Sequence, residues 1–222
     1  ATWGSVVYLS RVDVHSALVS SSLIAQLPEC QTMAGFEVGP VTQAAHGALR
    51  TYALSSVSDS QRAAAQKTFF AHALQQGIVS VHEMAGPQIS SHADARTLRD
   101  LASRPHMPHL AIYWGELWSE HSAQIVAELN AIRLGWDLFI DCALGSRTSL
   151  LHDPYTDLHT TPGAGYLTPA QVANHLSACT NAGMQGGFHV IGVQAFEIAM
   201  QVAQLSAQRT TESAFKRLRP HL

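Results

Sequence analysis

The sequence has 222 residues, the length of one large domain or two small ones. Hydrophobic residues make up 46% and charged residues 13%, which excludes a disordered or low-complexity chain. The formal net charge of -3 provides no basic field for nucleic acid or anionic lipid, so we expect neither as a partner.

Nothing in the sequence predicts a membrane span or a secretory signal. The uncharged stretch 14–28 contains His15 and several serines and ends at Pro28, and the first residues lack a basic start followed by an apolar run. The three cysteines include no Cys-x-x-Cys pair, which favours reduced, buried thiols. We therefore expect a cytoplasmic protein.

Short apolar strands alternate with amphipathic helices along the chain. After a strand at 5–9, the first strong helix is predicted over 59–76, with Ser58 and Gln61 forming a capping box and Gly77 ending it. Its apolar face would consist of Ala65, Phe69, Ala73 and Leu74. A strand at 78–81 follows and leads into His82 and Glu83.

The same alternation continues to the end of the sequence. The predicted elements are a helix at 94–103, a strand at 109–114, a helix at 119–134 ended by Gly135, a strand at 137–141, a helix from Thr168 to Gly183, a strand at 188–191 and a helix at about 194–218. Between the strand at 137–141 and the next helix lies a long loop, 145–167. Its length predicts an ordered loop at the mouth of the site.

Strands joined by crossover helices imply a parallel sheet or barrel. About five strands are predicted, whereas a closed (β/α)8 barrel needs eight. A doubly wound nucleotide-binding sheet would accommodate five, but neither a Gly-x-Gly-x-x-Gly turn nor a phosphate-binding loop is present. We predict a single α/β domain over 1–222, a partial (β/α)8 barrel that is not closed.

In parallel α/β folds, the functional residues gather at the carboxyl ends of the strands. Glu83, Asp141 and His189 stand at such positions, and together they could hold a divalent metal that activates water. A lone strand histidine is, however, more often a hydrogen-bonded core residue. His15 could touch a substrate from a strand-to-helix loop, although a cap for the next helix through Asp13 or Ser16 explains that segment equally well.

Other chemistries find less support in the residues. A Gly-x-Ser-x-Gly elbow is absent, and Cys142 has no histidine in a recognisable relation to it. The two lysines, Lys67 and Lys216, both fall inside predicted helices, so no lysine stands at a strand end to form a Schiff base.

The loop Asp141-Cys142-Ala143-Leu144-Gly145-Ser146-Arg147-Thr148 resembles the signature of amidohydrolase family 3. Three further matches occur in the family's order: 13–17 (Asp-Val-His-Ser-Ala), 77–83 (Gly-Ile-Val-Ser-Val-His-Glu) and 188–192 (Phe-His-Val-Ile-Gly). The resemblance implies a distorted (β/α)8 barrel beside a small β-sandwich. It also implies a metal-dependent hydrolase of non-peptide carbon–nitrogen bonds in a small-molecule substrate.

The resemblance assigns His189 as a metal ligand and Asp141, Arg147, His15 and Glu83 to the substrate site. The family's His-x-His pair, its later Arg-Ile-Glu-His strand and its final aspartate lie outside 1–222, and Val193 and Cys142 replace its usual Asp and Gly. A divalent metal, zinc above all, is therefore the family's cofactor, which we expect this chain not to retain. Three protein ligands are the minimum for catalytic zinc.

Three hypotheses follow for the chain. It is the central barrel segment of an amidohydrolase, a catalytically inactive fragment or product of a decayed gene, or an unrelated complete α/β binding protein. In-frame His-x-His and Arg-Ile-Glu-His coding sequence on either side would favour the first hypothesis, and stop codons the second.

Overall fold

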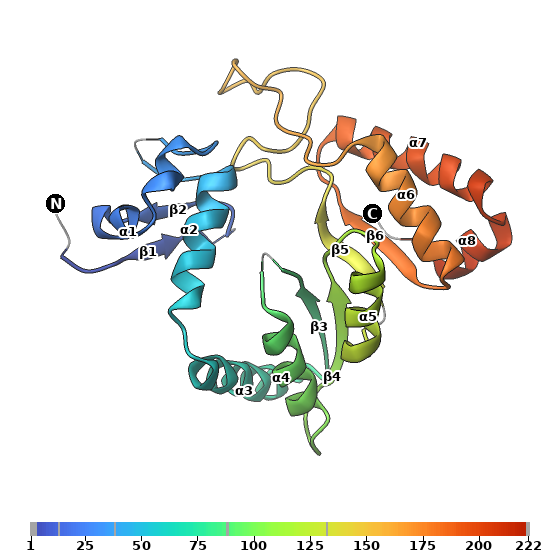
Figure 1. Cartoon of the computed structure of the whole chain (residues 1–222), viewed down its shortest axis with the longest axis horizontal. Helices are drawn as coiled ribbons and strands as arrows, with labels where there is room; N and C mark the ends of the chain where they lie inside the picture. Colours follow the sequence, from blue (N-terminus) through green and yellow to red (C-terminus); the bar gives the residue numbers. More distant parts are fainter. Residues whose placement is uncertain (1–3, 13, 38, 88, 132, 221–222) are drawn as a thin grey trace. The chain divides into compact units, whose positions relative to one another are not determined.

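A computed structural model describes residues 4–12, 14–37, 39–87, 89–131 and 133–220 of the chain (Figure 1). The chain forms two compact units, 1–61 and 62–222, which are described separately below. The single domain expected from the sequence stays a prediction.

The first unit contains an antiparallel hairpin and short helices. Its elements are β1 (Tyr8–Ser10), β2 (Ala17–Val19), α1 (Ser21–Gln26), the 3-10 helix η1 (Pro28–Thr32) and α2 (Gln43–Ser55). Leu9 of β1 pairs with Leu18 of β2, and Leu23, Val41 and Leu49 pack in the core of the unit. The strand predicted at 5–9 therefore belongs to a two-stranded hairpin and adds nothing to the parallel sheet.

The second unit is built on a parallel sheet with the strand order β3-β4-β5-β6. The strands are β3 (Ser80–Ala85), β4 (His109–Trp114), β5 (Arg133–Phe139) and β6 (Gln185–His189); the helices are α3 (Asp59–Gln75, which begins in the first unit), α4 (His92–Ala102), α5 (Glu120–Leu129), α6 (Pro169–Asn181), α7 (Val193–Arg209) and α8 (Glu212–Leu218). The predicted α/β class is confirmed. The described residues form an open, partial TIM-type barrel with four parallel strands where about five were expected.

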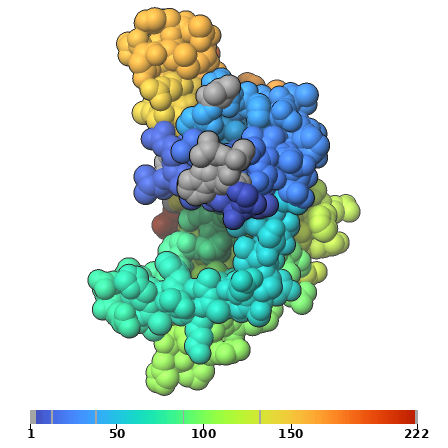
Figure 2. All heavy atoms as spheres, turned by 90° about the vertical axis from the view of Figure 1, so that its left-hand side faces the viewer, coloured from blue at the N-terminus to red at the C-terminus, as the bar shows by residue number. Residues whose placement is uncertain are grey.

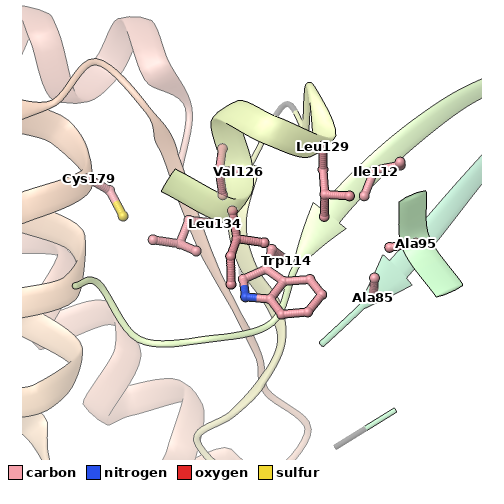
Figure 3. Packing of buried hydrophobic residues seen from close by; sticks show 9 residues of the cluster. Ala85, Ala95, Ile112, Trp114, Val126, Leu129, Leu134 and Cys179 are labelled. Atoms are coloured by element: carbon pink, nitrogen blue, oxygen red, sulfur yellow. The ribbon is translucent and has the colours of Figure 1, made fainter. Parts of the chain in front are cut away.

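Helices cover one face of this sheet. Ile112 and Trp114 of β4 pack with Leu134 of β5 against α4 and α5, and Cys179 of α6 reaches the same cluster (Figure 3). Farther along, Phe188 of β6 packs with residues of α6 and α7. Because successive side chains of a strand point to opposite faces, the residues between these positions lie on the other face, which corresponds to the interior of a barrel. We call it the uncovered face because these helices do not pack on it, although Ala111 and Tyr113 are buried there by their neighbours.

Several predicted helix ends are confirmed by their caps. Ser58 and Gln61 form the expected capping box, with the Gln61 amide donating to the Ser58 hydroxyl at 3.3 Å and the Ser58 amide donating to Gln61 Oε1 at 2.9 Å. Thr168 caps α6 with Gln171 in the same way, and Gly77 follows α3 with a positive φ of 75°. The predicted apolar face of α3 was wrong at Ala65, Phe69 and Leu74, which are exposed; the buried residues of this helix are Phe70 and Ala73.

The prediction of a helix over 119–134 was too long. The helix ends at Leu129 because Asn130 adopts the left-handed conformation with a φ of 51°, and β5 begins at Arg133. Gly135 lies inside that strand, where a Cβ atom would approach the Gly187 carbonyl oxygen to 2.1 Å. Its role is thus close strand contact and not helix termination.

Other boundaries also differ from the sequence prediction: strand 137–141 is found at Arg133–Phe139 and strand 188–191 at Gln185–His189. Helix 194–218 is divided into α7 and α8, since Thr211 starts a new helix by accepting a hydrogen bond from the Ala214 amide. Strand 78–81 is shifted to Ser80–Ala85, which leaves Val79 70% exposed and places His82 and Glu83 within the strand.

Candidate functional site

His82 and Glu83 lie on opposite faces of β3. Val81 and Ala85 pack against the helices, so Glu83 between them also faces the helix layer, while His82 lies on the uncovered face. The burial of Glu83, then the negative charges of Asp137 and Asp94, raise the pKa of its carboxyl group. The substrate-binding role assigned to Glu83 stays a prediction, and the structure places its side chain away from the barrel interior.

The uncovered face carries a polar network that the sequence analysis missed. His82 Nδ1 lies 2.7 Å from the hydroxyl oxygen of Tyr113, and this oxygen also accepts a hydrogen bond from Arg133. Since that oxygen accepts from Arg133, its own proton is available for His82 Nδ1. The Arg133 guanidinium lies over the Tyr113 ring, 4.8 Å from its centre. Alternation along β3 separates His82 from Glu83, but only the packing of Val81 and Ala85 against the helices shows that His82 lies on the uncovered face.

Asp141 holds together the loops that follow β5 and β6. Its side chain is fully buried, and its carboxylate accepts hydrogen bonds from three backbone amides: Leu150 at 2.8 Å, Ile191 at 2.8 Å and Gly192 at 2.6 Å. A Cβ atom on Gly192 would come within 2.6 Å of Asp141 Oδ2, so only glycine permits this approach. Asp141 therefore joins these two loops, and its part in a substrate site stays a prediction.

The long loop after Asp141 forms a pocket of about 660 Å³ at the carboxyl end of the sheet. Arg147, Tyr155, Asp157 and Val193 are among its lining residues. The Arg147 guanidinium pairs with the Asp157 carboxylate, which raises the pKa of the former and lowers that of the latter. The expected order of this loop is confirmed by its hydrogen bonds, including the one from the Gln194 amide to the Leu150 carbonyl at 3.2 Å.

His189 ends β6 on the uncovered face of the sheet. It pairs in register with Phe139 of β5, and the centres of the two rings lie 4.9 Å apart. Its side chain is therefore at the carboxyl end of the sheet, as the sequence predicts. Its role as a metal ligand stays a prediction.

His15 belongs to the first unit, in the turn of the β1–β2 hairpin. The Arg11 amide donates to the Ser16 carbonyl at 2.9 Å across this turn. The expected strand-to-helix loop was wrong here because a second strand follows, and α1 is capped by Ser20. Asp13, the other proposed cap, lies outside the described residues.

The described residues do not fit a catalytic metal. Nowhere in the part of the chain that the structure describes do three or more His, Cys, Asp or Glu side chains converge in a group that could hold an ion. Asp141 is already bound by three amides, and Glu83 lies on the face opposite to His82. We therefore derive no catalytic step through a metal for these residues.

The half-buried Cys142, the buried Cys179 and the buried His175 have surroundings that explain them as packing or hydrogen-bonding residues. Burial raises the pKa of Cys142, and it raises that of Cys179 to about 12, so neither thiol is activated. His175 accepts a hydrogen bond from the Trp118 amide at its Nδ1 atom, 2.9 Å away, and its Nε2 atom lies 3.3 Å from the Leu134 carbonyl. Burial lowers the pKa of His175 to about 4, which keeps it neutral.

Parallel strands with crossover helices, and polar side chains at the carboxyl ends of those strands, are consistent with a partial (β/α)8 barrel. The model of the Amidohydrolase family matches residues 4–218. The chain therefore belongs to the Amidohydrolase family, and the hypothesis of an unrelated α/β binding protein was wrong.

Two solved structures share the fold. One is an uncharacterized metal-dependent hydrolase from Pyrococcus horikoshii OT3, with 19% identity, a TM-score of 0.66 and coverage of 92% of this chain and 43% of the other. The second is an uncharacterized metal-dependent hydrolase from Pyrococcus furiosus, with 24% identity, a TM-score of 0.60 and coverage of 90% and 44%. This chain thus spans less than half the length of either structure.

No curated protein matches the chain. Among the helices of the described residues, none combines the length and the apolar character that a membrane span requires.

Proposed function

We propose that this chain carries the substrate loop of a hydrolase that cleaves an amide-like carbon–nitrogen bond in a small cytoplasmic molecule. The proposal is supported above all by the three amide hydrogen bonds to Asp141, which fix the loop over the carboxyl ends of β5 and β6. Membership of the Amidohydrolase family supports the reaction class.

In this proposal Arg147 binds the substrate and Asp141 positions the loop that carries Arg147. An anionic group of the substrate would replace Asp157 on the Arg147 guanidinium, because a planar guanidinium binds carboxylates through paired hydrogen bonds. Tyr155 helps to hold the loop in place, since its hydroxyl donates to the Ser149 carbonyl at 2.8 Å.

The experiment is a hydrolysis assay with N-acyl amino acids and cyclic amides, run beside metal analysis after dialysis against a mild chelator. Hydrolysis that falls at least about tenfold in Arg147→Ala, with a smaller loss for substrates lacking a carboxylate, would support the proposal. The matched control is Arg104→Ala, which changes an exposed arginine outside the loop.

The catalytically inactive fragment is the second candidate, and the same experiment tests it. Absence of hydrolysis by the folded chain across these substrates, with and without added zinc, would favour the second candidate. One tightly held metal per chain, lost together with activity in His189→Ala, would instead support His189 as a ligand and contradict the expected loss of zinc.

A further inference from the structure

A second cavity lies between β3 and the helices α3 and α4, on the helix-covered side of the sheet. Its volume is about 320 Å³. Val81 and Glu83 line it from the strand, Ala65, Gln66 and Phe69 from α3, and Ser90, Asp94, Ala95 and Leu98 from α4 and the segment before it. Figure 2 shows the outer surface of α3, coloured teal, which covers this side.

Glu83 is the unusual group in this cavity. It is half-buried, and among the described residues it has neither a hydrogen-bond donor nor a cationic partner. The Arg62 guanidinium is paired with another lining residue of the cavity, since Arg62 Nε lies 2.7 Å from Asp94 Oδ1. A carboxylate in such surroundings is costly to ionise unless a donor or cation reaches it.

Two further polar atoms of the cavity walls also have no hydrogen-bond partner among the described residues. These atoms are Gln66 Oε1 and Ser90 Oγ, and both are buried. The orientation of the Gln66 amide is fixed from its other end, because Nε2 donates to the Asp94 carbonyl at 3.2 Å. The cavity therefore offers acceptors at Glu83 and Gln66 and a hydroxyl at Ser90 that can also accept. Apart from Asp94, which is paired with Arg62, its remaining lining residues are apolar.

We propose that this cavity binds a small primary ammonium compound, with its charged nitrogen at Glu83 and Gln66 and its short apolar body against Phe69 and Leu98. An ammonium group has three N–H donors and no acceptor, which matches an acceptor-lined cavity. A metal ion is a poorer match, because the described residues offer no group of three ligands. The site is separate from the Arg147 pocket and does not depend on the proposed hydrolase activity.

The test is a calorimetric titration of the full chain with n-butylammonium, beside two probes that each lack one feature. Tetramethylammonium keeps the charge but has no N–H donors, and 1-butanol keeps the apolar body without the charge. We expect saturable binding of one n-butylammonium per chain and at least about tenfold weaker binding of both other probes.

Variants then locate the site. Glu83→Gln keeps the side-chain size but removes the charge and should weaken n-butylammonium binding at least about tenfold. Gln66→Leu removes the second acceptor and should also weaken it, while the exposed control Glu37→Gln should bind as the wild type does. Far-ultraviolet dichroism establishes that each variant is folded.

Three results would overturn the proposal: no saturable binding by the folded wild type, equal binding of 1-butanol, or unchanged binding when both Glu83→Gln and Gln66→Leu are folded.

Discussion

The two edges of the parallel sheet each carry a carboxylate shielded from water, but the partners of these two carboxylates differ. At the β5–β6 side, Asp141 is fully buried and accepts three backbone amide hydrogen bonds. At the β3 side, Glu83 has no such donor among the described residues and borders a cavity. A carboxylate whose oxygens already accept hydrogen bonds from backbone amides holds the loops together. A carboxylate without such donors can accept hydrogen bonds from a ligand. The following predictions test this comparison, beginning with the largest effect.

Asp141→Asn should give the largest loss of stability. The amide retains one acceptor oxygen and places N–H donors against backbone donors, so at least one buried amide loses its partner. We expect the free energy of unfolding to fall by about 3 kcal/mol or more, since hydrogen bonds to charged groups are strong and unmatched buried donors are costly. Urea unfolding measures this change.

Asp153→Asn is the matched control, because it makes the same change at an exposed position of the same loop. Its effect should stay within about 0.5 kcal/mol, as for most surface substitutions. Equal stabilities for the two variants would mean that Asp141 does not anchor the loop.

His175, which lies near β5 and β6, should make the free energy of unfolding fall at acid pH. Its pKa is lowered from 6.5 to about 4 in the folded state, so between these values the unfolded chain binds a proton that the folded chain does not. Stability from this group is therefore complete above pH 6.5 and falls as the pH drops to about 4, by up to about 3 kcal/mol.

The measurement is the pH dependence of urea unfolding for the wild type and His175→Asn, whose side-chain oxygen can still accept from the Trp118 amide. The slope between pH 6.5 and 4 should decrease in this variant and stay unchanged in the exposed control His121→Asn. Parallel slopes in all three proteins would contradict the buried, neutral His175.

Some parts of the fold were predictable from the sequence, and others were not. The capping boxes and the strand at 109–114 follow from local rules, because the residues that specify them are neighbours in the chain. The end of the helix at Leu129 and the strand position of Gly135 were missed. Gly135 is required by its contact with Gly187, fifty-two residues away, and such a contact leaves no local signal.

In the candidate site, the positions of some residues along the strands were predictable, but the faces on which they lie were not. Asp141 and His189 do lie near the carboxyl ends of strands, since the apolar runs around them identify the strands, but Asp141 follows β5 by two residues and His189 is the last residue of β6. The faces of His82 and Glu83 were not predictable in the same way. Alternation shows only that the two side chains point to opposite faces, and the helix-covered face becomes known only once α3 and α4 are in place.

Glu83→Gln should have a smaller effect than Asp141→Asn, and of the opposite sign. Because the folded pKa of Glu83 is raised, the unfolded chain loses this proton more readily, and the group destabilises the protein as the pH rises above 4.5. We expect Glu83→Gln to stabilise the ligand-free chain at pH 7, by less than Asp141→Asn destabilises it. The advantage should disappear near pH 4, and loss of stability at pH 7 would show that Glu83 has a structural partner.

Arg147→Ala should have the smallest effect on stability. The Arg147–Asp157 pair is exposed, and exposed pairs contribute little because water solvates the charges and salt screens them. The thermal midpoint should therefore match that of the wild type at both low and high salt, as should that of Asp157→Asn. A substantial decrease for Arg147→Ala at low salt that vanishes at high salt would assign the pair to the stability of the loop. An unchanged midpoint together with reduced hydrolysis of carboxylate-bearing substrates would place Arg147 in substrate binding, because such a variant loses affinity while the loop stays fixed by Asp141.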